Sequence, residues 1–148
     1  MTSPWDRLQP VKFGCVYFIE DSLIKFPPED HRTVHPKRAV LVVSSDRVNY
    51  EQNWELAYVL PLSSGSKSHP LDVRISAGNG GVTKKCWARI AHGQAVLKSE
   101  LQDCLDIHGV TSTVLRDVVS NMMHYTGIAE FMQIEQQKSL GGGFPSSF

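Results

Sequence analysis

Short apolar runs, separated by polar or glycine-containing connections, fill the first two thirds of the chain. Residues 13–19 are rich in aromatic and β-branched side chains, which favours a strand. Residues 38–45 contain an almost continuous apolar run, which is typical of a strand buried on both faces. Residues 56–62 form a third run, and we expect Pro61 to mark its end or a bulge because proline cannot donate to a central ladder.

Weaker strand signals follow in the middle of the chain. Residues 71–76 alternate between apolar and polar side chains, which is the pattern of a half-exposed strand. The glycine-rich stretch 78–81 predicts a turn. Residues 85–90 and 94–97 predict two more strands.

Helical patterns begin only after these strands. Residues 99–102 match a capping box, which predicts a short helix that Gly109 closes. A second helix is predicted over residues 112–125, and residues 128–139 predict a further helical piece. The face of the second helix that we expect to pack carries Leu115, Val118, Val119 and Met122. Strands first and helices last predict an α+β domain on a curled, mostly antiparallel sheet.

The remaining segments predict the domain organisation. Residues 20–36 hold several prolines and charges and no period, so we expect a long loop that covers a functional face. Residues 1–12 are expected to form an N-terminal arm, residues 13–128 a single domain, and residues 129–148 a C-terminal extension with a flexible Gly/Ser tail.

Composition narrows the class of protein. With 148 residues, of which 41% are hydrophobic, the chain fits one soluble globular domain. No run approaches the roughly 20 apolar residues of a membrane-spanning helix, and the N-terminus lacks a signal-peptide pattern, so we expect a cytoplasmic protein without a membrane partner. The three cysteines form no CxxC pair. We therefore expect reduced thiols, no metal site and no cofactor.

Charge is unevenly distributed although its sum is zero. Residues 31–99 carry ten Lys and Arg against four acidic residues, a surplus of six positive charges that the flanks cancel. A basic middle can attract phosphates, whereas the same charges can simply decorate a solvated surface. Charge alone favours the solvated surface.

A hydroxyl-rich loop follows the third apolar run. Its sequence is Ser63-Ser64-Gly65-Ser66-Lys67, so hydroxyls, exposed backbone N–H groups and a cation lie together. Such a combination suits an anion or a phosphodiester. Taken alone it is also ordinary loop composition, and it gains weight from the strand before it and the lysine after it.

Three strings, at residues 14–17, 35–43 and 60–67, occur in the order and spacing of a known family. Together they resemble the MazF/PemK family of toxin endoribonucleases from bacterial toxin–antitoxin systems, over roughly residues 13–128. The resemblance implies an SH3-like barrel with C-terminal helices and a homodimer. It also implies metal-independent cleavage of single-stranded RNA such as mRNA, and neutralisation by a cognate antitoxin that occupies the same groove.

The resemblance also implies particular site residues. A threonine of the family's Ser/Thr loop and an arginine before its second strand are central to catalysis. The threonine position falls on Ser64, and the arginine position falls on Lys37 by spacing or on Arg38 by residue type. On the later strand Lys85 stands for a second arginine, but Trp87 stands where some members have an aspartate.

Metal-free cleavage needs cations that stabilise a phosphorane, and a group that transfers protons near neutral pH. His35 and His69 lie close in sequence to the two candidate loops. The predicted catalytic residues are Lys37, Arg38, Ser64 and His69. The predicted RNA-binding residues are His35, Ser63, Ser66, Lys67, Lys85, Trp87 and Arg89. Trp87 can stack on a base, and it is equally well explained as a core residue.

Two alternatives remain open because Trp87 replaces the expected acid. One is a non-enzymatic toxin on the same fold, such as a gyrase poison resembling CcdB. The other is an RNA-binding regulator without turnover.

Overall fold

The computed structural model describes residues 11–27 and 34–141. Its strands are β1 (Val16–Glu20), β2 (Lys37–Val42), β3 (Leu56–Ser63), β4 (Val73–Ile75), β5 (Cys86–Ala88) and β6 (Gln94–Leu97). Its α-helices are α1 (Asp46–Asn49), α2 (Ser112–Tyr125) and α3 (Ile128–Gly141). Short 3-10 turns are η1 (Asp21–Leu23), η3 (Asn79–Gly81), η4 (Ile90–His92) and η5 (Lys98–Glu100). The predicted arm at 1–10, part of the long loop (28–33) and the tail from 142 onward lie outside the described residues.

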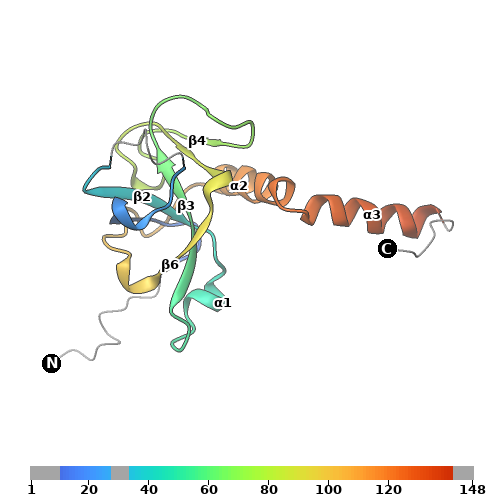
Figure 1. Cartoon of the computed structure of the whole chain (residues 1–148), viewed down its shortest axis with the longest axis horizontal. Helices are drawn as coiled ribbons and strands as arrows, with labels where there is room; N and C mark the ends of the chain where they lie inside the picture. Colours follow the sequence, from blue (N-terminus) through green and yellow to red (C-terminus); the bar gives the residue numbers. More distant parts are fainter. Residues whose placement is uncertain (1–10, 28–33, 142–148) are drawn as a thin grey trace.

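The six strands form one antiparallel sheet in the order β1-β2-β3-β5-β4, with β6 also paired to β3 (Figure 1). Strand β3 is the hub, because it pairs with β2 on one side and with both β6 and β5 on the other. The sheet does not close, since β1 and β4 end the path. The predicted mostly antiparallel sheet with C-terminal helices is therefore confirmed as an open form of the implied barrel.

Pro61 lies inside β3, so of the two alternatives predicted for it, a strand end or a bulge, the strand end is wrong. Along one edge of β3 the pairing partner changes, because the ladder with β6 reaches only to Val59 and the ladder with β5 starts at Leu62. The Pro61 carbonyl accepts from the Arg89 amide at 3.0 Å on the same side. The prolyl nitrogen, which has no proton to donate, therefore faces the gap between two ladder partners.

Both faces of the central strands are buried. Leu41 and Leu60 belong to an apolar cluster that includes Val118 of α2. Val40 and Val59 belong to a second cluster on the other side of the sheet. Because consecutive residues of a strand point to opposite faces, β2 is buried on both sides, as its continuous apolar run predicts.

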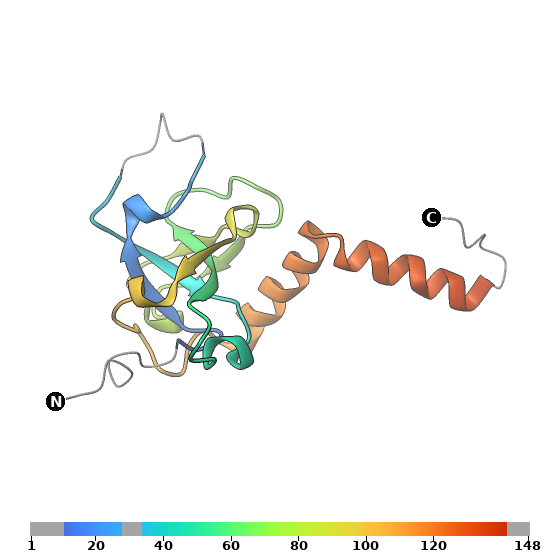
Figure 2. The same ribbon diagram turned by 60° about the horizontal axis from the view of Figure 1, so that its bottom comes forward.

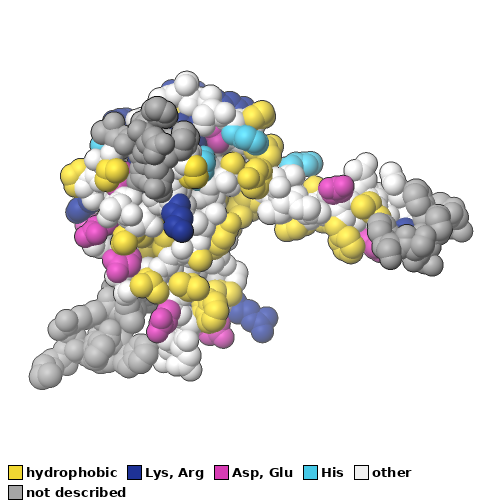
Figure 3. All heavy atoms as spheres, viewed as in Figure 1, with side chains coloured by type: hydrophobic (Ala, Val, Ile, Leu, Met, Phe, Trp, Pro, Cys, Tyr) yellow, Lys and Arg dark blue, Asp and Glu magenta, His cyan; other side chains and the backbone are white. Residues whose placement is uncertain are grey.

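Helix α2 spans the predicted residues and packs on the sheet, while α3 extends away from the domain in both views (Figures 1 and 2). The buried positions of α2 are Val114 and Val118, whereas Val119 is exposed, so the packed face is rotated slightly from the predicted one. Apolar side chains of α3 are visible at the surface in Figure 3. Phe131 and Met132 of this helix are exposed. None of the helices in the described ranges is long and apolar enough to cross a membrane.

The helix predicted from residue 99 is wrong. Only the single turn η5 forms there, and Leu101 already has extended backbone angles. Gln102 and Phe18 of β1 exchange two backbone hydrogen bonds, each of 2.8 Å. Pairing with the open edge of β1 therefore sets the extended conformation of residues 101–102, because two long-range hydrogen bonds outweigh a local capping preference.

Candidate nucleic-acid interface

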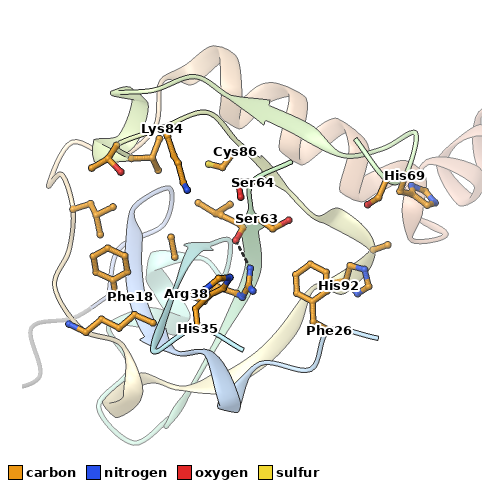
Figure 4. Close-up of a pocket in the computed structure, with 18 of the residues that line it drawn as sticks. Phe18, Phe26, His35, Arg38, Ser63, Ser64, His69, Lys84, Cys86 and His92 are labelled. Carbon is orange, nitrogen blue, oxygen red and sulfur yellow. Dashed lines mark hydrogen bonds between the residues drawn. The ribbon is translucent and has the colours of Figure 1, made fainter. Parts of the chain in front are cut away.

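A pocket of about 980 Å³ opens between β2, the end of β3 and the segments around η3 and η4. Figure 4 shows Arg38, Ser63 and Ser64 in its middle, with Phe26 and His92 on one side and Phe18 on the other. The polar side chains that line it are Lys37, Arg38, Lys84, His35, His69, His92, Ser63, Ser64, Ser68 and Thr83. Within the described parts of the chain, none of the lining residues is acidic. This composition suits an anionic ligand.

The pocket lies where β2 and β3 are no longer paired, and residues of both strands beyond their last pair line it. Their register ends at the Val40–Pro61 pair, and Arg38 bridges the two strands beyond it by donating from Nη1 to the Leu62 carbonyl at 3.0 Å. Asp21 holds the other edge of the guanidinium, with Oδ1 2.5 Å from Nε and Oδ2 3.3 Å from Nη2. Three of the five N–H groups of Arg38 are thus engaged. Its position in the pocket is set before any ligand arrives.

Lys37 has the opposite environment. Its side chain is 54% exposed, and Nζ lies 3.7 Å from the exposed carboxylate of Asp103 and 5.7 Å from the centre of the Phe18 ring. An exposed pair of this kind restrains a lysine only weakly. The two neighbouring cations are therefore a solvated ammonium and a fixed guanidinium.

The predicted serine loop leaves β3 at the pocket wall. Gly65 has a φ of +98°, a left-handed conformation that favours glycine. Its carbonyl accepts from Trp87 Nε1 at 2.9 Å and from Lys85 Nζ at 3.3 Å. In the described structure the backbone amides of residues 64–67 have no protein acceptor. The backbone N–H groups of the loop are therefore available to a ligand, whereas the Gly65 carbonyl is occupied by the side chains of Lys85 and Trp87.

Arg89 directly follows β5 and lies two positions after Trp87 in the chain. It is only 5% exposed, and Nη1 lies 2.6 Å from Oδ2 of Asp72. Asp72 is equally buried, so its prediction as the polar, exposed position of a half-exposed strand is wrong. Burial opposes ionisation of Asp72, but hydrogen bonds from the Ser68 amide and Arg89 outweigh it and hold its pKa below the ordinary value.

Two histidines differ in their surroundings. His69 accepts through Nδ1 from the Leu71 amide at 3.1 Å, so the neutral ring carries its proton on Nε2. His92 stacks on Phe26 with ring centres 4.5 Å apart, and burial lowers its pKa. Sequence reasoning missed His92, since nothing in the residues around it distinguishes it from a surface histidine.

The structure brings together six of the predicted residues, which line the pocket: His35, Lys37, Arg38, Ser63, Ser64 and His69. It places the other five outside the lining: Ser66, Lys67, Lys85, Trp87 and Arg89. Lys85 and Trp87 donate hydrogen bonds to the Gly65 carbonyl of the serine loop, and Arg89 is buried. Across the described residues, no group of three or more His, Cys, Asp or Glu side chains could hold a metal ion.

The model of the family described as "PemK-like, MazF-like toxin of type II toxin-antitoxin system" matches residues 22–125. The chain belongs to the PemK/MazF toxin family. The matched region ends at the last residue of α2, so α3 lies beyond the part that defines the family. No curated protein sequence matches the chain significantly.

Solved PemK/MazF-type structures share the fold. A MazE-MazF complex from Deinococcus radiodurans has a TM-score of 0.58 at 18% identity, over 80% of this chain and 96% of that one. The Mycobacterium tuberculosis toxin MazF-mt6 has a TM-score of 0.57 at 11% identity, over 74% and 93%. A mycobacterial endoribonuclease in complex with its cognate antitoxin has a TM-score of 0.55 at 16% identity, over 78% and 92%. At these identities the likeness establishes the fold alone.

Proposed function

We propose that this PemK/MazF-family toxin is an endoribonuclease that binds and cleaves single-stranded RNA in the pocket. The observation that carries the proposal is the convergence of Lys37, Arg38 and Lys84 with histidines and serine hydroxyls in one open cavity. Cations neutralise a phosphodiester, and hydroxyl and amide donors bind its oxygens. Structural relatives named as endoribonucleases support the same activity.

The proposed reaction is attack of a ribose 2′-OH on the adjacent phosphorus, without a metal ion. It yields a 2′,3′-cyclic phosphate on one fragment and a 5′-OH on the other. The phosphorane gains negative charge, which Lys37, Arg38 and the Ser64 hydroxyl stabilise. Proton transfer falls to the imidazoles that line the pocket, with His69 as the first candidate and His35 as the second.

Arg38 and Lys37 stabilise the phosphorane in different ways. Arg38 is held by Asp21 and Leu62, so it presents a fixed guanidinium edge to the phosphate. Lys37 is solvated, so it can move onto a non-bridging oxygen as the charge develops. Both cations therefore stabilise the phosphorane. We assign to Lys37 the interaction that strengthens more between the bound substrate and the transition state.

The decisive experiment treats a long unstructured RNA with the purified protein in EDTA and identifies the new ends. We expect discrete cuts that leave 5′-OH termini and 2′,3′-cyclic phosphates. Cleavage that disappears in EDTA would contradict the metal-free route. RNA that is bound but never cut would contradict the enzyme and support the RNA-binding alternative, which Trp87 at the family's acidic position favours.

We also propose a homodimer that a cognate antitoxin neutralises. Family membership supports both partners, and two of the structural relatives were solved with an antitoxin. Light scattering of the purified protein tests the dimer, and a monomer at micromolar concentration would overturn it. Co-expression with the protein encoded beside the toxin should abolish RNA cleavage.

A further inference from the structure

Arg89 is the most heavily engaged side chain behind the pocket. Nε donates to Ser63 Oγ at 2.5 Å, and Nη2 donates to the Ser64 carbonyl at 3.3 Å. Nη1 donates to Ser68 Oγ at 3.2 Å and to Asp72 Oδ2 at 2.6 Å. One guanidinium therefore contacts both ends of the serine loop.

Asp72 completes the arrangement from the far end of the loop. Its Oδ2 accepts from the Ser68 amide at 2.9 Å, from Ser68 Oγ at 3.1 Å and from the His69 amide at 3.0 Å. The Leu71 carbonyl beside it accepts from Asn121 of α2 at 2.8 Å. The segment that carries His69 is thus anchored to Arg89 through Asp72 and to α2 through Asn121.

A buried Arg–Asp pair is weak evidence for stability, because apolar residues of similar volume are often at least as stabilising. Its distinguishing property here is geometry, since the planar fork of an arginine can serve several acceptors at fixed angles. Those acceptors are on Ser63, Ser64 and Ser68, and none of them is a substrate group. A lysine could pair with Asp72 but could not reach all of them together.

We propose that Arg89 is a positioning residue that, with Asp72, sets Ser64 and His69 in place for the phosphate of the RNA; this inference rests on the proposed function. Arg89 does not touch the substrate. It lies behind the loop, as its 5% exposure requires, and acts on the reaction through the loop backbone and hydroxyls. The residue predicted to bind RNA from its charge instead holds the residues that do.

The test compares Arg89→Lys with Arg74→Lys, the same substitution on the exposed face of the adjacent strand β4. We expect Arg89→Lys to lower the single-turnover cleavage rate at least tenfold while the affinity for an uncleavable 2′-deoxy oligonucleotide changes less than twofold. Arg74→Lys should leave both unchanged. Equal cleavage rates in the two variants would overturn the proposal, as would a loss of oligonucleotide affinity in Arg89→Lys, which would make Arg89 a contact residue.

A second readout needs no RNA and separates this inference from the proposed function. Amide hydrogen exchange at Ser68 and His69 should be at least fivefold faster in Arg89→Lys than in the wild type, with the central strands unchanged. Unchanged exchange would overturn the inference. If the wild type cuts no RNA, the proposed function fails, and this exchange comparison alone decides whether Arg89 holds the loop.

Ser68→Ala provides a variant that keeps the buried ion pair, in case Arg89→Lys does not fold. It removes one acceptor of Arg89 and one donor to Asp72 in an exposed segment. We expect a cleavage rate about threefold lower, against no change in Ser76→Ala, an exposed serine after β4. Identical rates in these two variants would count against the proposal.

Discussion

Asp21 receives two hydrogen bonds from the guanidinium of Arg38, and its carboxylate also accepts from the His35 amide at 2.9 Å. The aspartate is inaccessible to solvent, whereas the neighbouring Lys37–Asp103 pair is largely exposed. Adjacent residues of one strand thus take part in a buried and an exposed ion pair. The comparison of the two pairs leads to a direct prediction.

Asp21→Ala should lower the free energy of unfolding by about 3–5 kcal/mol, because it leaves a buried arginine without its carboxylate. Asp103→Asn, which keeps a side chain suited to the positive φ at that position, should change it by less than about 1 kcal/mol. Urea unfolding followed by circular dichroism measures both. Equal effects would show that the buried pair contributes no more than the exposed one.

Lys37→Ala should reduce the single-turnover cleavage rate about tenfold or more, because a cation that meets the developing phosphorane charge is removed. The melting temperature should stay within about 2 °C, since the side chain is exposed. Lys37→Arg should retain most of the rate. A Lys37→Ala variant with the wild-type rate would transfer this role to Arg38.

Ser64→Ala should lower the cleavage rate by about tenfold to a hundredfold, since a hydroxyl donor to the phosphate is lost. Ser64→Thr should remain active because it keeps that hydroxyl. Neither change should unfold the protein, as Ser64 is exposed at the start of the loop. Wild-type rates in the alanine variants of Ser64, Lys37 and Arg38 together would show that the site lies elsewhere.

Stability should fall in acid partly through Asp72. Its pKa is lowered in the folded protein, so its contribution is fully present above the ordinary value of 3.8 and is lost as the pH falls through the lowered value. Asp72→Asn should therefore show a shallower loss of unfolding free energy below about pH 4 than the wild type. Parallel curves would indicate that Asp72 titrates alike in the folded and unfolded chains.

The thiols should react at very different rates. Burial and the adjacent Cys104 raise the pKa of Cys15 to about 11, and burial also raises the pKa of Cys86. Cys104 is exposed. At pH 8 a thiol reagent should label one cysteine rapidly, and Cys104→Ser should abolish that rapid phase. Fast labelling of two cysteines would mean that a buried thiol becomes accessible through local opening.

Local patterns predicted most of the secondary structure. The buried strand after residue 38, the strand at 94–97 and the helix at 112–125 all form as expected, because apolar periodicity reports which face of an element is buried. The segment from residue 99 failed for a tertiary reason. Its capping pattern is local, whereas its pairing with Phe18 depends on a strand more than 80 positions earlier in the chain.

The residues of the candidate site were likewise predicted only in part from the sequence. Residue types and order singled out Lys37, Arg38, Ser64 and His69, which the fold brings to one pocket. Lys85, Trp87 and Arg89, which were also predicted to contact RNA, do not line this pocket and instead donate hydrogen bonds to the serine loop. Charge and residue type do not report whether a side chain faces a ligand or a neighbouring carbonyl.

The sequence by itself therefore determined the α+β class, the family resemblance and the hydroxyl-rich loop beside a basic segment. These are local properties of composition, spacing and period. Only the tertiary structure decided that Asp21 fixes Arg38 while Lys37 stays solvated, and that Arg89 and Asp72 are buried together. Each of these outcomes depends on which distant groups share a low-dielectric interior, where an unpaired charge is costly. These pairs form only because the fold places η1 against β2 and Asp72 against Arg89, the residue after β5.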